Sequence, residues 1–166
     1  SNPRMVTVFS ILFINQIVET VTMRGFEGVD VDFEFILASD RVAFAEFVGE
    51  LRTAVNALGY PVSVALAPKT SDTQQGLLYE GKDYALLGAA ADSVLLMTYE
   101  WGYTYGPPMA VAPVNSVRQV VEYAVTKIPP EKIDLGIPNY GYDWPLPFER
   151  GVTRAKTIGN IEAVQI

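Results

Sequence analysis

The sequence contains neither cysteine nor histidine among its 166 residues. The absence of cysteine excludes disulfide scaffolds and thiolate zinc sites, although it leaves the redox compartment open. The absence of histidine excludes the Ser-His-Asp triad, and without thiols a Cys–His nucleophile is excluded as well. General acid–base chemistry in this chain must therefore use carboxylates, lysine or tyrosine.

Basic residues are also scarce, since 12 Lys and Arg stand against 19 Asp and Glu, which gives a net charge of −7 at pH 7. This balance argues against nucleic acid and against an anionic membrane surface as partners, because both attract positive charge. Hydrophobic residues make up 49% of the chain, too many for an intrinsically disordered protein.

The apolar run at residues 5–14 is shorter than the ~20 residues that a membrane-spanning helix needs. A remnant of a signal peptide is one interpretation, but Asn15 and Gln16 do not resemble a small-residue cleavage site. We expect a buried helix or strand here instead.

Four apolar segments are typical of β-strands, and they lie at residues 28–36, 61–67, 93–99 and 133–140. Apolar residues at helical spacing predict helices over residues 44–58 and 116–128, with weaker patterns over 83–90 and 14–21. Ser39 can cap the start of the first of these helices and Gly59 can end it. Strands that alternate with helices indicate βαβ units and a parallel sheet.

The loops after these strands lack the glycine-rich phosphate motifs of doubly wound sheets. They carry acids and aromatics instead, namely Glu34, Tyr99, Glu100, Trp101, Tyr140 and Trp144. Side chains at the C-terminal ends of several parallel strands form the active site of a (β/α)8 barrel. We therefore expect an α/β fold of that kind.

The segment GFEGVDVDFEFI, residues 25–36, places Asp30, Asp32 and Glu34 on one side of a strand, about 6.5–7 Å apart. If this side points into a barrel, the three acids leave water together and titrate as a coupled set, so at least one holds its proton to a higher pH than an isolated carboxyl group. A protonated carboxyl group beside an ionised one is what a glycosidase uses. Glu34, nearest the mouth, is the natural proton donor and Asp32 its charged neighbour.

Two other interpretations of the acidic segment remain open at this point. A half-exposed strand with a solvated acidic side gives the same alternation. Clustered carboxylates also suit Mg²⁺ or Ca²⁺, although the EF-hand spacing is absent.

Several segments resemble one family. EGVDVDFE, residues 27–34, is similar to the D-G-x-D-x-D-x-E signature of glycoside hydrolase family 18, the chitinase family. LLMTYEWG at 95–102 resembles its M-x-Y-D segment, and LGIPNYGYDW at 135–144 resembles its strand-seven segment. ALAPKTS, GLLYEGKDYA and YGYDWPLPF resemble one branch, the spore-cortex peptidoglycan hydrolases, which are N-acetylglucosaminidases of endospore-forming bacteria.

The resemblance implies a retaining mechanism in which the 2-acetamido group of the substrate is the nucleophile. Glu34 would protonate the glycosidic oxygen and Asp32 would orient the acetamido N–H. Asp30 would sit behind Asp32 and share protons with it, and Tyr99 would hydrogen-bond the acetamido oxygen. The implied partner is a glycan with 2-acetamido sugars, either chitin or peptidoglycan, and no metal or cofactor is implied.

The resemblance also implies a set of substrate-binding residues. They are Met97, Glu100, Trp101, Tyr140 and Trp144. Met97 would line the floor of the cleavage subsite, but simple core packing remains an alternative. Trp144 would stack on sugar or pack a loop, and the same alternative holds for Trp101, Tyr103 and Tyr105.

The chain departs from the family pattern in three places, with Glu27 and Glu100 where Asp is usual and Phe33 where Trp is frequent. It is also short, because a (β/α)8 barrel takes ~250 residues. The fold expected is therefore part of a (β/α)8 barrel, about its strands four to seven, and residues 1–166 are expected to be a partial catalytic domain, incomplete at both ends.

A half barrel has two open sheet edges, so we expect either self-association or a place within a longer protein. By resemblance we expect a site of action in the spore or cell wall. A catalytically silent glycan-binding protein and an inactive fragment of the hydrolase remain the alternatives, and retention of Glu34 argues against the first.

Overall fold

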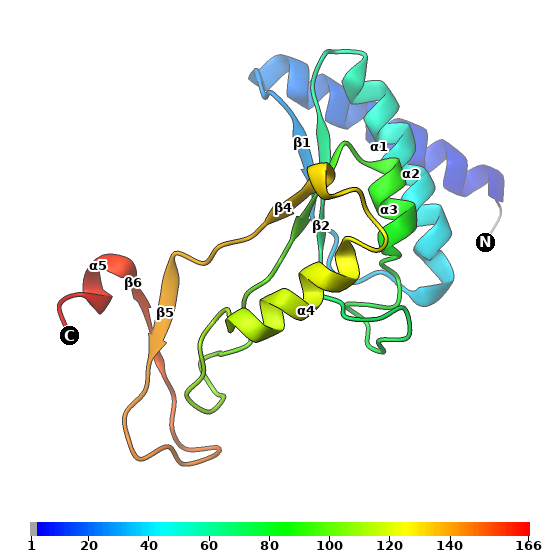
Figure 1. Ribbon diagram of the computed structural model, residues 1–166. Coiled ribbons are helices and arrows are strands. Elements are labelled where there is room, and N and C mark those ends of the chain that lie inside the picture. The colour runs from blue at the N-terminus through cyan, green and yellow to red at the C-terminus, as the bar shows by residue number, and fades with distance from the viewer. Residues whose placement is uncertain (1–2) are drawn as a thin grey trace.

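The computed structural model describes residues 3–166, with side chains from residue 10 onward (Figure 1). The helices are α1 Pro3–Arg24, α2 Arg41–Asn56, α3 Tyr84–Ala90, α4 Val114–Ala124 and α5 Asn160–Ala163. The strands are β1 Val29–Val31, β2 Val62–Leu66, β3 Ser93–Leu96, β4 Ile133–Leu135, β5 Tyr140–Asp143 and β6 Lys156–Gly159. Short 3₁₀ turns, Ala38–Asp40 and Pro130–Lys132, precede α2 and β4.

Strands β1 to β4 form a sheet in which all neighbours are parallel, in the order β1-β2-β3-β4. One row of paired residues crosses it, in which Val31 pairs with Val64, Val64 with Val94, and Val94 with Ile133. The order of strands in space therefore follows their order in the chain. This confirms the parallel sheet predicted from the alternation of strands and helices.

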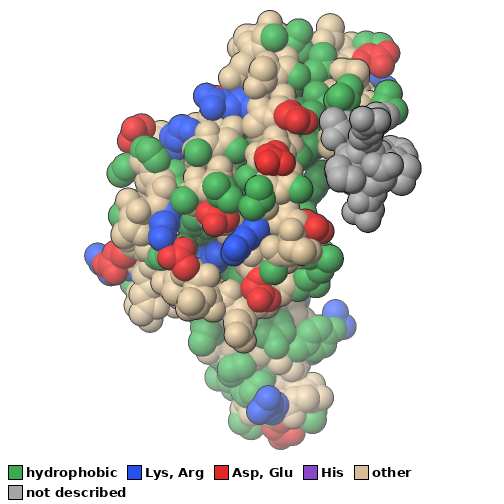
Figure 2. Space-filling view, turned by 90° about the vertical axis from the view of Figure 1, so that its right-hand side faces the viewer, with side chains coloured by type: hydrophobic (Ala, Val, Ile, Leu, Met, Phe, Trp, Pro, Cys, Tyr) green, Lys and Arg blue, Asp and Glu red, His purple; other side chains and the backbone are tan. Residues whose placement is uncertain are grey.

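Helices α1, α2 and α3 lie on the same side of the sheet (Figure 1). The core between these helices and the sheet contains the predicted apolar stripe of α2 and the buried side chains of β2. They are Phe44, Val48, Leu51, Val55, Val62, Val64 and Leu66. The outer face of these helices carries acidic and basic side chains interspersed with apolar ones (Figure 2).

The predicted cap of α2 is wrong. Ser39 lies inside the 3₁₀ turn before the helix, and its hydroxyl donates to Asp40 Oδ1 at 3.2 Å instead of binding the first backbone N–H groups. Gly59 does mark the end of this helix, because its φ of +85° is a left-handed conformation that glycine adopts without strain.

The first strand is shorter than the predicted 28–36, since β1 ends at Val31. Phe33 then turns toward α2 and stacks on Phe44 and Phe47, with ring centroids 5.8 and 5.9 Å apart. Phe33 thus faces the same helices as Val31, so the alternation seen in the sequence continues beyond the strand itself.

The fourth strand also ends early, at Leu135 instead of residue 140. Pro138 has no N–H to donate and cannot continue a strand ladder. Tyr140 begins a separate antiparallel hairpin, in which it pairs with Gly159 and Asp143 pairs with Lys156. The sequence analysis did not predict this hairpin, which stands away from the parallel sheet (Figure 1).

Residues 5–14 belong to α1, so the helix alternative was correct for this run. Only one stripe is buried, because Ile14 is 6% exposed whereas Ile11 and Leu12 are 50% and 54% exposed. The burial of residues 5–9 lies outside the described side chains. From residue 3 to residue 166, none of the helices combines the length and the apolar character that crossing a membrane requires.

Candidate active site

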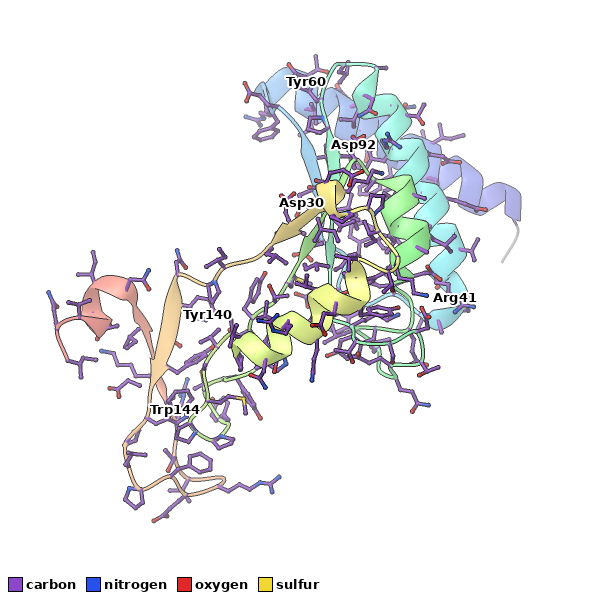
Figure 3. The ribbon with its side chains drawn as sticks, in the orientation of Figure 1. Asp30, Arg41, Tyr60, Asp92, Tyr140 and Trp144 are labelled. Atoms are coloured by element: carbon purple, nitrogen blue, oxygen red, sulfur yellow. The ribbon has the colours of Figure 1, made fainter. Side chains whose placement is uncertain are left out.

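The first acid of the predicted row, Asp30, lies on the short strand β1. Asp32 and Glu34 come after this strand, toward the C-terminal edge of the sheet. Val31 is buried in the core with the helices, whereas its neighbours Asp30 and Asp32 are exposed. Figure 3 labels Asp30 on this strand. Glu34 is exposed as well. The expectation that the acids leave water is wrong for this chain, because its four strands form an open sheet that does not enclose them.

The innermost acid, Asp30, is fixed by β2. The hydroxyl of Ser63 donates a short hydrogen bond to Oδ1 of Asp30, and the two residues pair in the sheet. This contact holds the carboxylate against the strand and leaves Asp32 and Glu34 as the acids nearer the C-terminal edge.

Tyr99 lies beside this row. Partial burial raises the pKa of its phenol, and the negative charges of Asp32 and Asp30 raise it further, with smaller effects from Glu100 and Glu34. The charges of all three acids thus reach the Tyr99 phenol, and the catalytic roles assigned to these residues from the sequence stay predictions.

The backbone around Tyr99 is held by bonds between β2, β3 and β4. The N–H of Met97 donates to Leu66 at 3.0 Å, and the N–H of Gly136 donates to Leu96 at 2.9 Å. Thr98, 1% exposed, donates from its hydroxyl to the carbonyl oxygen of Gly136 at 3.1 Å. Met97 is half-buried, which fits both core packing and the floor of a subsite.

Glu100 has a left-handed backbone, with φ of +66°. Its carboxylate accepts hydrogen bonds from the hydroxyl groups of Tyr140 and Tyr142, the latter at 2.8 and 3.1 Å. Burial and the bond to Glu100 raise the pKa of Tyr140 above its ordinary value. These contacts tie the β5–β6 hairpin to the end of β3.

Trp144 is half-buried and donates from Nε1 to the carbonyl oxygen of Gly106 at 2.9 Å. It borders, with Tyr140 and Tyr142, an open cleft of 630 Å³ whose other wall is residues 109–112. Figure 3 places Tyr140 and Trp144 on the hairpin, apart from Asp30. These aromatic residues therefore line a separate cleft beyond the acidic row.

The other aromatic candidates differ in burial. Trp101 packs against the core, which agrees with the packing alternative. Tyr103 and Tyr105 are 49% and 61% exposed, and the guanidinium of Arg154 lies 5.3 Å from the ring centroid of Tyr105.

Three residues that the sequence analysis did not single out belong to this region. Tyr142 follows Tyr140 by two positions, and period-two alternation would have placed both hydroxyl groups on one face. Lys69 and Lys82 are 4% and 1% exposed, and both lie in segments that carried the family resemblance. The available signal was Lys69, three residues after the end of the buried strand β2.

A metal-binding alternative finds no support in residues 3–166, because no three acidic side chains there are placed to hold an ion.

A comparison of the sequence with models of protein families identifies its family. The model described as "Glycosyl hydrolases family 18" matches residues 9–163. The chain belongs to glycosyl hydrolase family 18. The resemblance noted in the sequence is thereby confirmed.

Relatives within the family extend the comparison. A "Cortical fragment-lytic enzyme" of Bacillus subtilis is 47% identical over 153 residues, which are 92% of this chain and 36% of the relative. The spore cortex-lytic enzyme SleL of Bacillus cereus superposes with a TM-score of 0.86 at 39% identity, over 92% of this chain and 35% of that chain.

A chitinase from Chromobacterium violaceum superposes with a TM-score of 0.81 at 29% identity, over 92% of this chain and 46% of that chain. The predicted fold class, part of a (β/α)8 barrel, is confirmed by these family 18 structures. The chain spans about a third of the length of its spore-enzyme relatives.

Proposed function

We propose that residues 1–166 form part of the catalytic domain of a glycoside hydrolase that cleaves N-acetylglucosaminyl bonds with retention of configuration. The observation that carries the proposal is the row Asp30, Asp32 and Glu34 with Tyr99 beside it, in a chain that belongs to family 18. The exposed position of Glu34 leaves its carboxyl group accessible to a glycan.

In the first step proposed, the carboxyl group of Glu34 donates its proton to the glycosidic oxygen. The carbonyl oxygen of the 2-acetamido group attacks C1, so that one C–O bond forms as the glycosidic C–O bond breaks. Asp32 accepts a hydrogen bond from the acetamido N–H and stabilises the positive charge of the oxazolinium ion. Tyr99 donates to the acetamido oxygen and orients it for attack.

In the second step, the Glu34 carboxylate takes a proton from water while the water oxygen attacks C1 and opens the oxazolinium ring. Each of the two displacements inverts the configuration at C1, so the product keeps the configuration of the substrate. Asp30, held by Ser63, shares protons with Asp32 as that group gains and loses charge.

The proposed substrate is the glycan of spore-cortex peptidoglycan, cleaved in the spore or cell wall. The support is the 47% identity to a protein named for lysis of cortical fragments. Chitin is the second candidate, supported by the likeness to a chitinase.

The test is digestion of cortex muropeptides and of chitooligosaccharides by the protein at its full natural length. We expect new reducing ends at N-acetylglucosamine, with retained anomeric configuration by NMR. Because a general acid contributes ~10²–10⁴-fold to rate, Glu34→Gln should lose at least that much activity. Equal rates for the variant and the wild type would remove Glu34 from the mechanism.

A glycan stripped of its N-acetyl groups is the matched control for the nucleophile. We expect no cleavage of it, because a free amine offers no carbonyl oxygen to attack C1. Cleavage at an unchanged rate would require a protein nucleophile instead.

Two other outcomes of the digestion test would lead to different conclusions. Glycan binding without cleavage by the full-length protein would identify a silent family member. Activity in the full-length protein and none in residues 1–166 would show that the part alone is inactive. Self-association through the open sheet edges stays a prediction, and sedimentation of a folded monomer at all concentrations would contradict it.

A further inference from the structure

The ladder between β1 and β2 stops at a specific carbonyl group. The N–H of Val29 donates to Pro61 at 3.1 Å, and the register pairs Val29 with Val62 and Val31 with Val64. Because donors and acceptors recur every second residue in a parallel ladder, the carbonyl oxygen of Ala65 also faces β1. β1 has ended by that level, so the next backbone donor does not reach it.

A buried ammonium group takes the place of that donor. Nζ of Lys82 donates to the carbonyl oxygen of Ala65 at 3.1 Å, and Lys82 is 1% exposed. By the same register the donor that would reach Ala65 is the N–H of Phe33, the residue between Asp32 and Glu34, so the ammonium lies at the level of the acidic row.

The backbone before Lys82 is fitted tightly to the chain that follows the acidic row. A Cβ atom on Gly81 would lie 2.1 Å from the carbonyl oxygen of Ile36, so only glycine fits there. This close approach fixes the backbone at Gly81, the residue directly before Lys82.

The charges that face Lys82 are those of the acidic row. Burial lowers the pKa of Lys82, and the negative charges of Asp32, Glu34 and Asp30 oppose this effect, Asp32 most strongly. Lys82 has three N–H donors. Among residues 3–166, the carbonyl of Ala65 is the hydrogen-bond acceptor found for them, and no carboxylate lies within 4 Å.

Lys69, the second buried lysine, differs in this respect. Its Nζ donates to the carbonyl oxygen of Lys82 at 3.0 Å, and the opposite charges nearest to it are Asp83 and Asp72. The two lysines share one network but face different acids.

We propose that Lys82 is a positioning residue of the hydrolase, whose buried ammonium offsets the mutual repulsion of Asp30, Asp32 and Glu34. The inference rests on the proposed function for its consequence. Three clustered carboxylates without a cation take up protons more readily, and protonation of Asp32 removes the charge that stabilises the oxazolinium ion.

The test compares Lys82→Met, Lys82→Arg and the control Lys69→Met in the full-length protein. Loss of the cation favours protonated carboxyl groups, so both limbs of the pH profile of kcat/KM should move to higher pH in Lys82→Met, by about one unit. Lys82→Arg should restore the wild-type profile. Lys69→Met should lower the melting temperature and leave both limbs in place.

A purely structural role would lower activity without moving the profile, and that result would overturn the proposal. An equal shift in Lys69→Met would overturn it too, because the effect would then belong to the network as a whole.

A second measurement does not need activity. The carboxyl ¹³C signals of Asp32 and Glu34 should titrate at higher pH in Lys82→Met than in the wild type. If wild-type protein cleaves none of the glycans, the proposed function fails while this titration still decides the role of Lys82. Should Lys82→Met not fold, the wild-type ¹⁵Nζ signal of Lys82 should shift as the row titrates, and a flat response would contradict the proposal.

Discussion

Gly136 lies directly against the ring of Tyr99: a Cβ atom at this position would be 2.5 Å from Cε1 of the tyrosine. Gly136 follows β4, and Tyr99 follows β3, so two neighbouring strand ends meet at this contact. Because Gly136 has no side chain, the ring of Tyr99 can lie against its backbone.

Gly136→Ala should therefore displace Tyr99 and reduce kcat/KM by about 10–100-fold, because a misplacement of ~1 Å in a positioning group costs up to ~10²-fold. The loss of stability should stay within the ~1–3 kcal/mol typical of overpacking. Steady-state kinetics and urea unfolding measure the two effects.

Gly159→Ala is the matched control, since nothing lies within 4 Å of a Cβ atom there. It should keep wild-type kinetics. If Gly136→Ala were as active as this control, Tyr99 would not be a positioning group in the reaction.

The double variant Tyr140→Phe, Tyr142→Phe should release Glu100, because it removes both hydroxyl donors to that carboxylate. We expect KM for glycan to rise several-fold, since the hairpin borders the cleft, while kcat changes little because the acidic row is untouched. A kcat that falls with KM unchanged would place these tyrosines in the chemical step instead.

Asp92 accepts three hydrogen bonds at the N-terminal edge of the sheet, near Tyr60 (Figure 3). The donors are Nε of Arg52 at 2.6 Å, Nδ2 of Asn56 at 2.9 Å and the N–H of Val62 at 2.8 Å. Burial raises the pKa of this carboxyl group, but the three bonds outweigh it and hold the pKa below its ordinary value.

A carboxyl group with a lowered pKa stabilises the fold above its unfolded value of about 4, and this contribution is lost as pH falls through the folded value. Asp92→Asn should therefore lower the free energy of unfolding by about 2 kcal/mol at pH 7, and the difference should shrink toward pH 3. Urea unfolding at both pH values measures it. Asp134→Asn, at an exposed acid on β4, should change the free energy by under about 0.5 kcal/mol.

Tyr84, 1% exposed, donates from its hydroxyl to Ala67 at 2.6 Å and accepts from the N–H of Lys69 at 3.0 Å. Burial raises the pKa of Tyr84 above its unfolded value of about 10. Its contribution is therefore complete below pH ~10 and is lost as pH rises further.

Tyr84→Phe should cost about 1–3 kcal/mol at pH 7, because two buried backbone groups lose their partner. The variant should also lose less stability than the wild type between pH 9 and pH 11. Thermal melts across that range measure the difference, and parallel losses in the two proteins would contradict the assignment to Tyr84.

The hydrophobic pattern was sufficient to predict the parallel sheet, because the buried stripes of β2 and α2 are local properties of the sequence. It was insufficient to place the end of β1 at Val31, because residues 32–36 keep the alternation without belonging to the ladder. It did not predict the burial of Lys82 either, because that depends on a bond to Ala65, 17 residues away in the chain.

The candidate site was predicted only in part in its geometry, and its chemistry stays a prediction. Asp30, Asp32 and Glu34 lie near enough to Tyr99 for their charges to raise the pKa of its phenol, because parallel strands end at one edge. The left-handed Glu100 could not be foreseen, since a non-glycine residue adopts that backbone only when its surroundings hold it there. The antiparallel hairpin was missed because its two strands are short and polar.

The sequential order of β1, β2, β3 and β4 bears on how this part of a barrel is made during synthesis. Each strand that leaves the ribosome finds the strand before it already available as a pairing partner. Each new pairing closes a single crossover and never one that spans several strands, although parallel pairing is slow compared with local contacts. These four strands, half of the eight in a closed barrel, can thus pair in the order of translation, one βαβ unit after another.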